Sequence, residues 1–282
     1  MHVLVIGSEG FVGSKLVDKL LSDSEINGKG IKELTLADVI APSMPLEDAD
    51  FTVHTAKIDI SDGDQIIGLL EGRPDIIFHL VGEGDEADFN GYKVNVESTH
   101  KILEAIRLMG DYKPRLVYNS TLAVFGPPLP DVVPDQHACT PASSYGTQAA
   151  ILELLIGDYS RKGYLDGVCI RLPTVVIRPF EPNKTASSFL SSIIREPIAN
   201  MEAACPVPLS FRHPVASGRA AVRFLVRAAS LTEKELTDGR AITMPSLSVT
   251  VGDMIQSLEN VTGKHAVELI KHEPDDSLQS IA

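Results

Sequence analysis

The sequence predicts an α/β fold built on a doubly wound parallel sheet, and three observations indicate it. Short apolar runs rich in β-branched residues alternate with amphipathic stretches along most of the 282 residues. The runs are apolar almost throughout, as in strands that are buried on both faces. The first run, residues 2–6, ends in a turn rich in glycine. Strands and helices that alternate in this way form a parallel sheet with helices on both faces.

The turn after the first strand has the spacing G-x-x-G-x-x-G, and residues 11–21 continue as an amphipathic helix. Glycines suit a strand that turns sharply into a helix while its backbone approaches a pyrophosphate at the helix N-terminus. The spacing differs by one residue from G-x-G-x-x-G, yet in this context it predicts a Rossmann-type dinucleotide site. The expected cofactor contacts in this stretch are Gly7, Gly10, Phe11, Val12 and Gly13.

Asp38 ends the next strand, where the dinucleotide fold places an acid on the ribose hydroxyls of the adenosine. A carboxylate there repels a 2′-phosphate, and no Arg follows Asp38 directly, so the sequence favours NAD over NADP. Asp59 and Ile60 close the following strand-like stretch. Because open α/β sheets bind ligands at the carboxyl ends of their strands, we expect these two residues beside the adenine.

The alternation of elements continues to about residue 172. A proline-rich loop over 127–141 interrupts it, and Asn95 lies within the helix predicted over 92–109. We expect Asn95 to hold the sheet edge through backbone hydrogen bonds rather than to act in catalysis. Helices are predicted over 65–70, 92–109 and 144–162, and strands over 34–38, 51–55, 75–81, 115–119 and 167–171.

After Pro173 the chain changes character, because six prolines break residues 179–214 into short pieces. That composition suits a smaller lobe that covers a substrate. We therefore expect an NAD-binding Rossmann domain over 1–172 and a substrate-binding lobe over 173–282, with some segments returning to the first domain. Within 173–282, helices are predicted over 187–195, 217–229 and 251–261, and a strand over 240–244.

The composition argues against several classes of partner. A formal net charge of −13 opposes binding to a nucleic-acid backbone. The three cysteines have neither an even count nor metal-ligand spacing, which indicates a reducing compartment. No basic leader and no apolar stretch of membrane-spanning length is present, so we expect a cytoplasmic protein without a membrane partner. The scattered histidines predict no metal site.

Taken together, the motifs resemble the extended short-chain dehydrogenases, also called the NAD-dependent epimerase/dehydratase family. The resemblance covers nearly the whole chain, and it rests on Gly7–Gly13, Asp38, Asp59–Ile60, His79–Leu80, Asn95–Val96, Ser120–Thr121, Val124–Gly126 and Tyr145. A second set of motifs is similar to the D-erythronate dehydrogenases within that family, at residues 171–174, 178–183, 194–197, 205–208 and 243–251.

The resemblance implies a catalytic tyrosine and a lysine on one helix, with three residues between them. The tyrosine, here Tyr145, exchanges a proton with the substrate hydroxyl while hydride moves to or from the nicotinamide. The lysine binds the nicotinamide ribose and lowers the pKa of the tyrosine. A hydroxyl at Thr121 bonds the reacting oxygen. Further cofactor contacts implied by the resemblance are Leu80, Ser120, Tyr145 and Pro173.

Alanine stands at position 149, where the lysine belongs. An unperturbed tyrosine has a pKa of about 10, so on the order of one in a thousand is ionised at pH 7. We therefore expect impaired chemistry. Three explanations stay open: an introduced substitution that traps a complex, a natural loss that leaves cofactor binding without redox turnover, or replacement by another base such as Lys184 or His213.

Arg178 and Asn183 are the substrate candidates, because a guanidinium grips a carboxylate with two hydrogen bonds and an amide reads a hydroxyl. Other features depart from the erythronate-type enzymes. The loop after His79 is shorter, Phe180–Glu181 replaces a glycine and a basic residue, and the chain stops at Ala282 before its relatives do. The substrate wall is in doubt for these reasons, and we expect the second lobe to be incomplete.

The prediction is an NAD-dependent oxidoreductase acting on a secondary alcohol of a sugar acid, with C2 of a four-carbon acid as the reacting centre. The alternative is a non-redox member of the fold, such as an isomerase, a cyclase or a cofactor-binding protein, that takes a more apolar substrate. The expected partner is a small molecule. The resemblance also implies a homodimer formed through helices 92–109 and 144–162.

Overall fold

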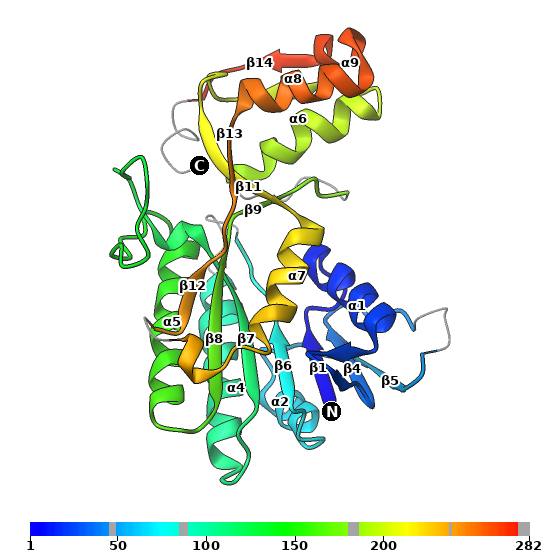
Figure 1. The fold of residues 1–282 in the computed structure, drawn as a ribbon, viewed down its shortest axis with the longest axis vertical. Helices are drawn as coiled ribbons and strands as arrows, with labels where there is room; N and C mark the ends of the chain where they lie inside the picture. Colours follow the sequence, from blue (N-terminus) through cyan, green and yellow to red (C-terminus); the bar gives the residue numbers. More distant parts are fainter. Residues whose placement is uncertain (45–48, 85–89, 180–185, 237–238, 276–282) are drawn as a thin grey trace. The chain divides into compact units, whose positions relative to one another are not determined.

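The computed structural model describes residues 1–44, 49–84, 90–179, 186–236 and 239–275, which fall into two units (Figure 1). Of these residues, the first unit holds those within 1–83, 90–172 and 219–244, and the second holds those within 173–218 and 245–275. The boundary expected from the sequence, between residues 172 and 173, coincides with a boundary between the two units. Residues 219–244 return to the first unit, and the sequence did not specify which segments would return.

The first unit is built on a seven-stranded sheet in the order β12-β8-β7-β6-β1-β4-β5, and every neighbouring pair is parallel. The four consecutive residues Val3–Ile6 of β1 are all buried, as expected of a strand that is covered on both faces. The predicted α/β class with a doubly wound parallel sheet is confirmed. The strands are β1 (His2–Ile6), β4 (Glu33–Asp38), β5 (Thr52–Lys57), β6 (Ile76–His79), β7 (Arg115–Thr121), β8 (Asp166–Leu172) and β12 (Ala241–Thr243).

Helices cover this sheet. Three of them share one hydrophobic cluster with β1, β6 and β7: α2 (Gly63–Leu70), α4 (Ser98–Leu108) and α5 (Ser144–Arg161). Helices α1 (Phe11–Asp23) and α7 (Gly218–Ala228) lie side by side (Figure 1). The remaining short elements are the hairpin β2 (Glu25–Ile26) and β3 (Lys29–Gly30), α3 (Asn90–Tyr92), a π-helical turn (Lys93–Glu97) and 3-10 turns at Leu122–Val124 and Glu233–Glu235.

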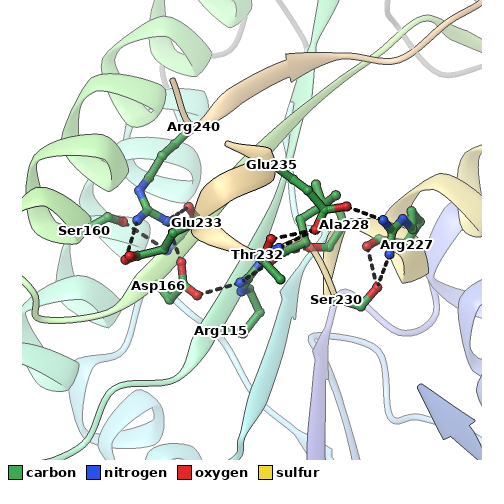
Figure 2. A network of polar contacts seen from close by, with 12 residues as sticks. Arg115, Ser160, Asp166, Arg227, Ala228, Ser230, Thr232, Glu233, Glu235 and Arg240 are labelled. Carbon is green, nitrogen blue, oxygen red and sulfur yellow. Dashed lines mark hydrogen bonds and ion pairs between the residues drawn. The ribbon is translucent and has the colours of Figure 1, made fainter. Parts of the chain in front are cut away.

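The returning segment is anchored by a polar network at the amino ends of β7 and β8 (Figure 2). Arg115 donates to the carbonyl oxygens of Ala228 (3.0 Å) and Leu231 (2.6 Å), and its Nη2 also pairs with Asp166. Arg240 donates to the other oxygen of Asp166 and to the carbonyl oxygen of Gly167 (2.9 Å). Asp166 thus joins two arginines, and the chain that follows α7 is held where β12 can add to the sheet edge at β8.

The second unit has its own core of buried apolar residues from α6, α8 and the short strands. Its strands form a three-stranded sheet, β13-β11-β9, and a parallel pair, β10-β14. Its elements are β9 (Thr174–Val176), a 3-10 turn (Ala186–Ser188), α6 (Phe189–Ile198), β10 (Ala203–Cys205), β11 (Arg212–Ser217), β13 (Leu247–Thr250), α8 (Val251–Thr262), α9 (Lys264–Glu268) and β14 (Ile270–His272). Among the described helices of both units, none is long and apolar enough to cross a bilayer.

Candidate functional site

The glycine turn between β1 and α1 is as tight as its spacing predicts. Gly7 has φ +90°, a conformation that residues with a side chain rarely adopt. At Gly13, an added Cβ would lie 1.9 Å from the carbonyl oxygen of Gly7, so only glycine lets α1 approach the turn. Phe11 and Val12 form the first residues of the helix. The five residues expected at a pyrophosphate are therefore one continuous turn and helix start.

Asp38 lies at the carboxyl end of β4, next to that turn. Its Oδ2 accepts the backbone N–H of Glu9 (2.9 Å) and its Oδ1 accepts the N–H of Ile40 (3.1 Å). The carboxylate is half-buried and held by two backbone donors. It can still accept hydrogen bonds from the hydroxyls of a ribose, because each carboxylate oxygen has a second lone pair.

Three further predicted cofactor residues lie at the same edge of the sheet. Leu80 follows β6 and donates its N–H to Ile6 (2.9 Å), and its carbonyl carbon is 3.1 Å from where a Cβ on Gly7 would lie. Asp59 and Ile60 follow β5. Backbone and side-chain hydrogen bonds from Ser61 hold the pKa of Asp59 below its usual value, so its carboxylate is charged at neutral pH.

These residues fit a dinucleotide on observations of their own. Gly10 caps α1 without a side-chain hydrogen bond, so the first N–H groups of a 13-residue helix are available to an anion. The Ser8 hydroxyl is buried, and no group among the described residues pairs with it. An unpaired buried hydroxyl inside a glycine turn is the kind of group that a bound phosphate satisfies. The turn therefore matches the pyrophosphate of NAD.

The elements that carry Tyr145 and Thr121 approach each other closely. Tyr145 is in the first turn of α5, which Ser143 caps by accepting the N–H of Gly146 (3.0 Å). A Cβ on Gly146 would lie 2.0 Å from the carbonyl oxygen of Ala123, so glycine lets α5 pack onto the turn that follows Thr121. Thr121 Oγ1 accepts the N–H of Ala123 (3.1 Å), which leaves its O–H to donate to another group.

The loop after β6 contacts the tyrosine. A Cβ on Gly82 would lie 3.6 Å from the Tyr145 hydroxyl. Asn95, in the π-helical turn, holds this loop by accepting the N–H of Glu83 and donating to its carbonyl oxygen, both at 2.8 Å. It also donates to Gln148 of α5 (2.6 Å). Asn95 therefore has the structural role expected of it, and the half-buried Tyr145 hydroxyl lies at the loop that Asn95 orders.

Ser120 enters a buried charge network. Its hydroxyl donates to Oε1 of Glu153 (2.5 Å), and Glu153 pairs with Arg171 through contacts of 2.7, 2.9 and 3.2 Å. The Arg171 guanidinium also lies over the Phe125 ring, 4.9 Å from its centroid. Because the Ser120 proton is used by Glu153, what Ser120 offers a cofactor is its oxygen as an acceptor and its backbone.

Ala149 is buried and packs with Val124 and Phe125 in a small apolar cluster. It lies one turn beyond Tyr145 on α5, at the spacing where the family has its lysine. The adenosine and pyrophosphate parts of the site therefore fit NAD, whereas the cation that holds the nicotinamide ribose in the family is absent at this position.

Two further predicted site residues, Pro173 and Arg178, belong to the second unit. Pro173 is buried directly after β8. Arg178 has its backbone fixed on α6, because its N–H donates to Ser191 (3.2 Å) and its carbonyl oxygen accepts from Arg195 (2.7 Å). Asn183, Lys184 and Phe180–Glu181 lie outside the described residues. His213, the other replacement base considered, bonds Thr174 (2.7 Å) and stacks on Phe211.

Sequence reasoning missed four residues that shape this site. Gly146 could have been found from the sequence, because a glycine inside a helix is unfavourable and can indicate that another backbone segment packs closely there. The Glu153–Arg171 pair had no local signal, because its partners are 18 residues apart on a helix and a strand. Glu9 occupies a variable position of the glycine motif, so the spacing assigned it no role. The described residues hold no group of three or more metal-ligating side chains.

Comparison with known proteins gives the same picture of the chain. The sequence profile of the NAD dependent epimerase/dehydratase family matches residues 3–209. The chain is 41% identical over 289 residues to a D-erythronate dehydrogenase of Cupriavidus necator, covering 100% of this chain and 88% of that protein. It is 40% identical over 285 residues to a D-erythronate dehydrogenase of Haemophilus influenzae, covering 100% and 89%.

Among solved structures, the chain is similar to one described as a nucleoside-diphosphate-sugar epimerase from Agrobacterium tumefaciens. The TM-score is 0.92 with 44% sequence identity, over 99% of this chain and 83% of that one. These relatives are described by two different activities, a dehydrogenase and an epimerase. The choice between them for this chain depends on its site.

Proposed function

This chain belongs to the NAD dependent epimerase/dehydratase family, and we propose that it is an NAD-dependent dehydrogenase for a secondary alcohol of a sugar acid of the D-erythronate type. The observation that carries the proposal is identity of about 40% to two D-erythronate dehydrogenases along the entire chain. The tight glycine turn and the acid at the end of β4 support NAD as the cofactor.

In this proposal the reaction needs a base at the alcohol oxygen and a donor that orients it. Tyr145, as the phenolate, takes up the hydroxyl proton as the carbon–oxygen double bond forms. Thr121 orients the reacting oxygen. Its Oγ1 accepts the N–H of Ala123, so the hydroxyl hydrogen can still be donated to the substrate, which supports that role. Bound NAD supplies the hydride acceptor. Arg178 and Asn183 are the proposed contacts to the substrate carboxylate and hydroxyls.

Ala149 determines how well Tyr145 performs this role. The methyl group of Ala149 carries no charge and packs in an apolar cluster, so position 149 itself supplies no positive charge to stabilise a phenolate at Tyr145. Each unit by which the pKa of Tyr145 exceeds the working pH lowers the fraction of phenolate about tenfold, which corresponds to about 1.4 kcal/mol. We therefore propose that the chain binds NAD and turns over slowly.

The experiment compares the chain with its Ala149→Lys variant. Binding of NAD is titrated, and NADH absorbance is followed with D-erythronate and related four-carbon sugar acids. We expect both proteins to bind NAD and the lysine variant to turn over at least a hundredfold faster, with its rate depending on the ionisation of Tyr145. The Ala149→Lys/Tyr145→Phe double variant is the control, and it should lose the gain.

A non-redox activity on a more apolar substrate is the second candidate, and the alanine at position 149, packed in an apolar cluster with Val124 and Phe125, favours it. It would be supported if both proteins bound NAD tightly and neither oxidised any sugar acid. Failure of either protein to bind NAD would refute both candidates.

We also propose a homodimer formed through α4 and α5. These helices lie side by side, since Tyr159 of α5 contacts His100 and Glu104 of α4. Each exposes a leucine, Leu108 at 73% and Leu154 at 76%. Light scattering should give the dimer mass for the chain and the monomer mass for Leu154→Glu. A cytoplasmic location is the expectation that the three free thiols support.

A further inference from the structure

Glu9 is placed beside Asp38 by the backbone of the glycine turn. The N–H groups of Gly7 and Ser8 both donate to the carbonyl oxygen of Ala37, at 2.8 and 3.3 Å. These bonds lay the turn across the end of β4. The next residue, Glu9, then donates its N–H to Asp38 Oδ2. The turn that would hold the pyrophosphate and the acid that would hold the ribose are therefore one hydrogen-bonded unit, with Glu9 at the junction.

The side chain of Glu9 is held at that junction as well. Its Oε1 accepts the N–H of Ser43 (3.2 Å), in the segment that follows β4. The side chain is half-buried and spans from the glycine turn to the segment on the far side of Asp38. A second carboxylate is thus held at the end of β4, between the glycine turn and the segment that follows Asp38. This is the strand end at which the proposed adenosine ribose would bind.

Lys57 is the Cα partner of Asp38 in the parallel register of β4 and β5, so this strand end carries a basic residue as well as an acid. Glu9 adds a second acid to the same end of the sheet and makes its formal charge negative. The 2′-phosphate of NADP carries a charge of about −1.5 to −2 at pH 7, whereas the 2′ hydroxyl of NAD is neutral.

We propose that Glu9 is a second determinant of cofactor choice, whose carboxylate excludes the 2′-phosphate of NADP while Asp38 binds the ribose hydroxyls of NAD. This inference rests on the proposed NAD-binding function. It assigns two roles to two acids. Asp38 contributes affinity for NAD, and Glu9 contributes selectivity against NADP without contributing much affinity for NAD.

The test measures binding of NADH and NADPH by dinucleotide fluorescence, which requires no turnover. Glu9→Gln removes the charge and keeps an oxygen acceptor for the Ser43 N–H. We expect it to raise NADPH affinity about tenfold, which corresponds to about 1.4 kcal/mol, and to change NADH affinity less than threefold. Glu25→Gln, an exposed position on β2, is the matched control and should change neither affinity. Asp38→Asn should instead weaken NADH binding.

Salt provides a second measurement on the unchanged chain, which needs no variant to fold. Selectivity caused by a half-exposed carboxylate is screened as ionic strength rises. The ratio of NADH to NADPH affinity should therefore fall by several-fold between 0.05 M and 0.5 M salt. A ratio that stays constant with salt, or a Glu9→Gln variant with an unchanged ratio, would overturn the inference while leaving NAD binding intact. Absence of NADH binding to the unchanged chain would instead overturn the proposed function, and with it this inference.

Discussion

The buried pair of Glu153 and Arg171 allows a quantitative test of what holds the site in place. The two side chains are only 6% and 9% exposed, and three contacts of 3.2 Å or less join them. Burial disfavours the charged form of Arg171, but its hydrogen bonds to Glu153 and the negative charge of that carboxylate outweigh burial and raise the pKa of the guanidinium. Removal of one partner therefore leaves a buried charge without compensation, at a cost of about 3–5 kcal/mol.

The prediction is a strongly non-additive double-mutant cycle. We expect Glu153→Leu and Arg171→Met each to lower the free energy of unfolding by about 3–5 kcal/mol. The double variant should lose only about 1–3 kcal/mol, because an apolar pair of similar volume replaces the ion pair and the main loss is the acceptor of the buried Ser120 hydroxyl. The coupling energy is then several kcal/mol.

The assay is urea unfolding followed by circular dichroism, with the thermal midpoint as a second readout. A loss of 3 kcal/mol corresponds to a fall of about 10 °C for a chain of this size. If the losses of the two single variants simply added in the double variant, or if Glu153→Leu cost under about 1 kcal/mol, the pair would not be the buried anchor that its geometry indicates.

Three further predictions concern stability. Gly13→Ala places a Cβ 1.9 Å from a backbone oxygen, so it should open the glycine turn, cost about 1–3 kcal/mol and weaken NADH binding measured by fluorescence. Gly146→Ala places a Cβ 2.0 Å from the carbonyl oxygen of Ala123 and should lower the thermal midpoint. Gly157→Ala, in the same helix but with open space around it, is the control and should raise the midpoint, because alanine favours a helix over glycine. Equal shifts of the midpoint in the two variants would contradict the close approach at Gly146. Burial lowers the pKa of His79 to about 4, so as pH falls below 6.5 the unfolded chain takes up a proton before the folded chain does. The free energy of unfolding should therefore drop by about 3 kcal/mol between pH 6.5 and 4. His79→Asn should reduce this dependence of the unfolding free energy on pH, measured by urea titrations.

The fold class and the position of most elements were predictable because local pattern and topology agree. Buried parallel strands read as apolar runs, and β1, β4, β6, β7 and β8 all do so. A strand over 240–244 was predicted, but in the smaller lobe. Its membership of the main sheet, as β12, depends on Asp166 and two arginines from distant parts of the chain, and no local pattern encodes such a network.

The candidate site also combines features that are local in the sequence with contacts between distant residues. The glycine turn and Asp38 are local features with a fixed spacing, so their chemistry is visible in the sequence. The partner of Ser120 is not, because Glu153 reaches it from a helix 33 residues further on. The same holds for Asn95 and Gln148, which meet across 53 residues to order the loop at Tyr145.

By itself, the sequence determined that this chain has a parallel α/β sheet and a glycine turn between its first strand and helix, and it predicted an acid suited to NAD and an alanine at the position of a catalytic lysine. Each of these depends on residue type and spacing within a few turns of chain. Only the tertiary structure decided that Glu9 lies against the segment after Asp38, that Ala149 is buried among apolar side chains and that Ser120 gives its proton to a buried ion pair. Those facts depend on which distant segments pack together, because burial and charge pairing are set by neighbours in space and not by neighbours in sequence.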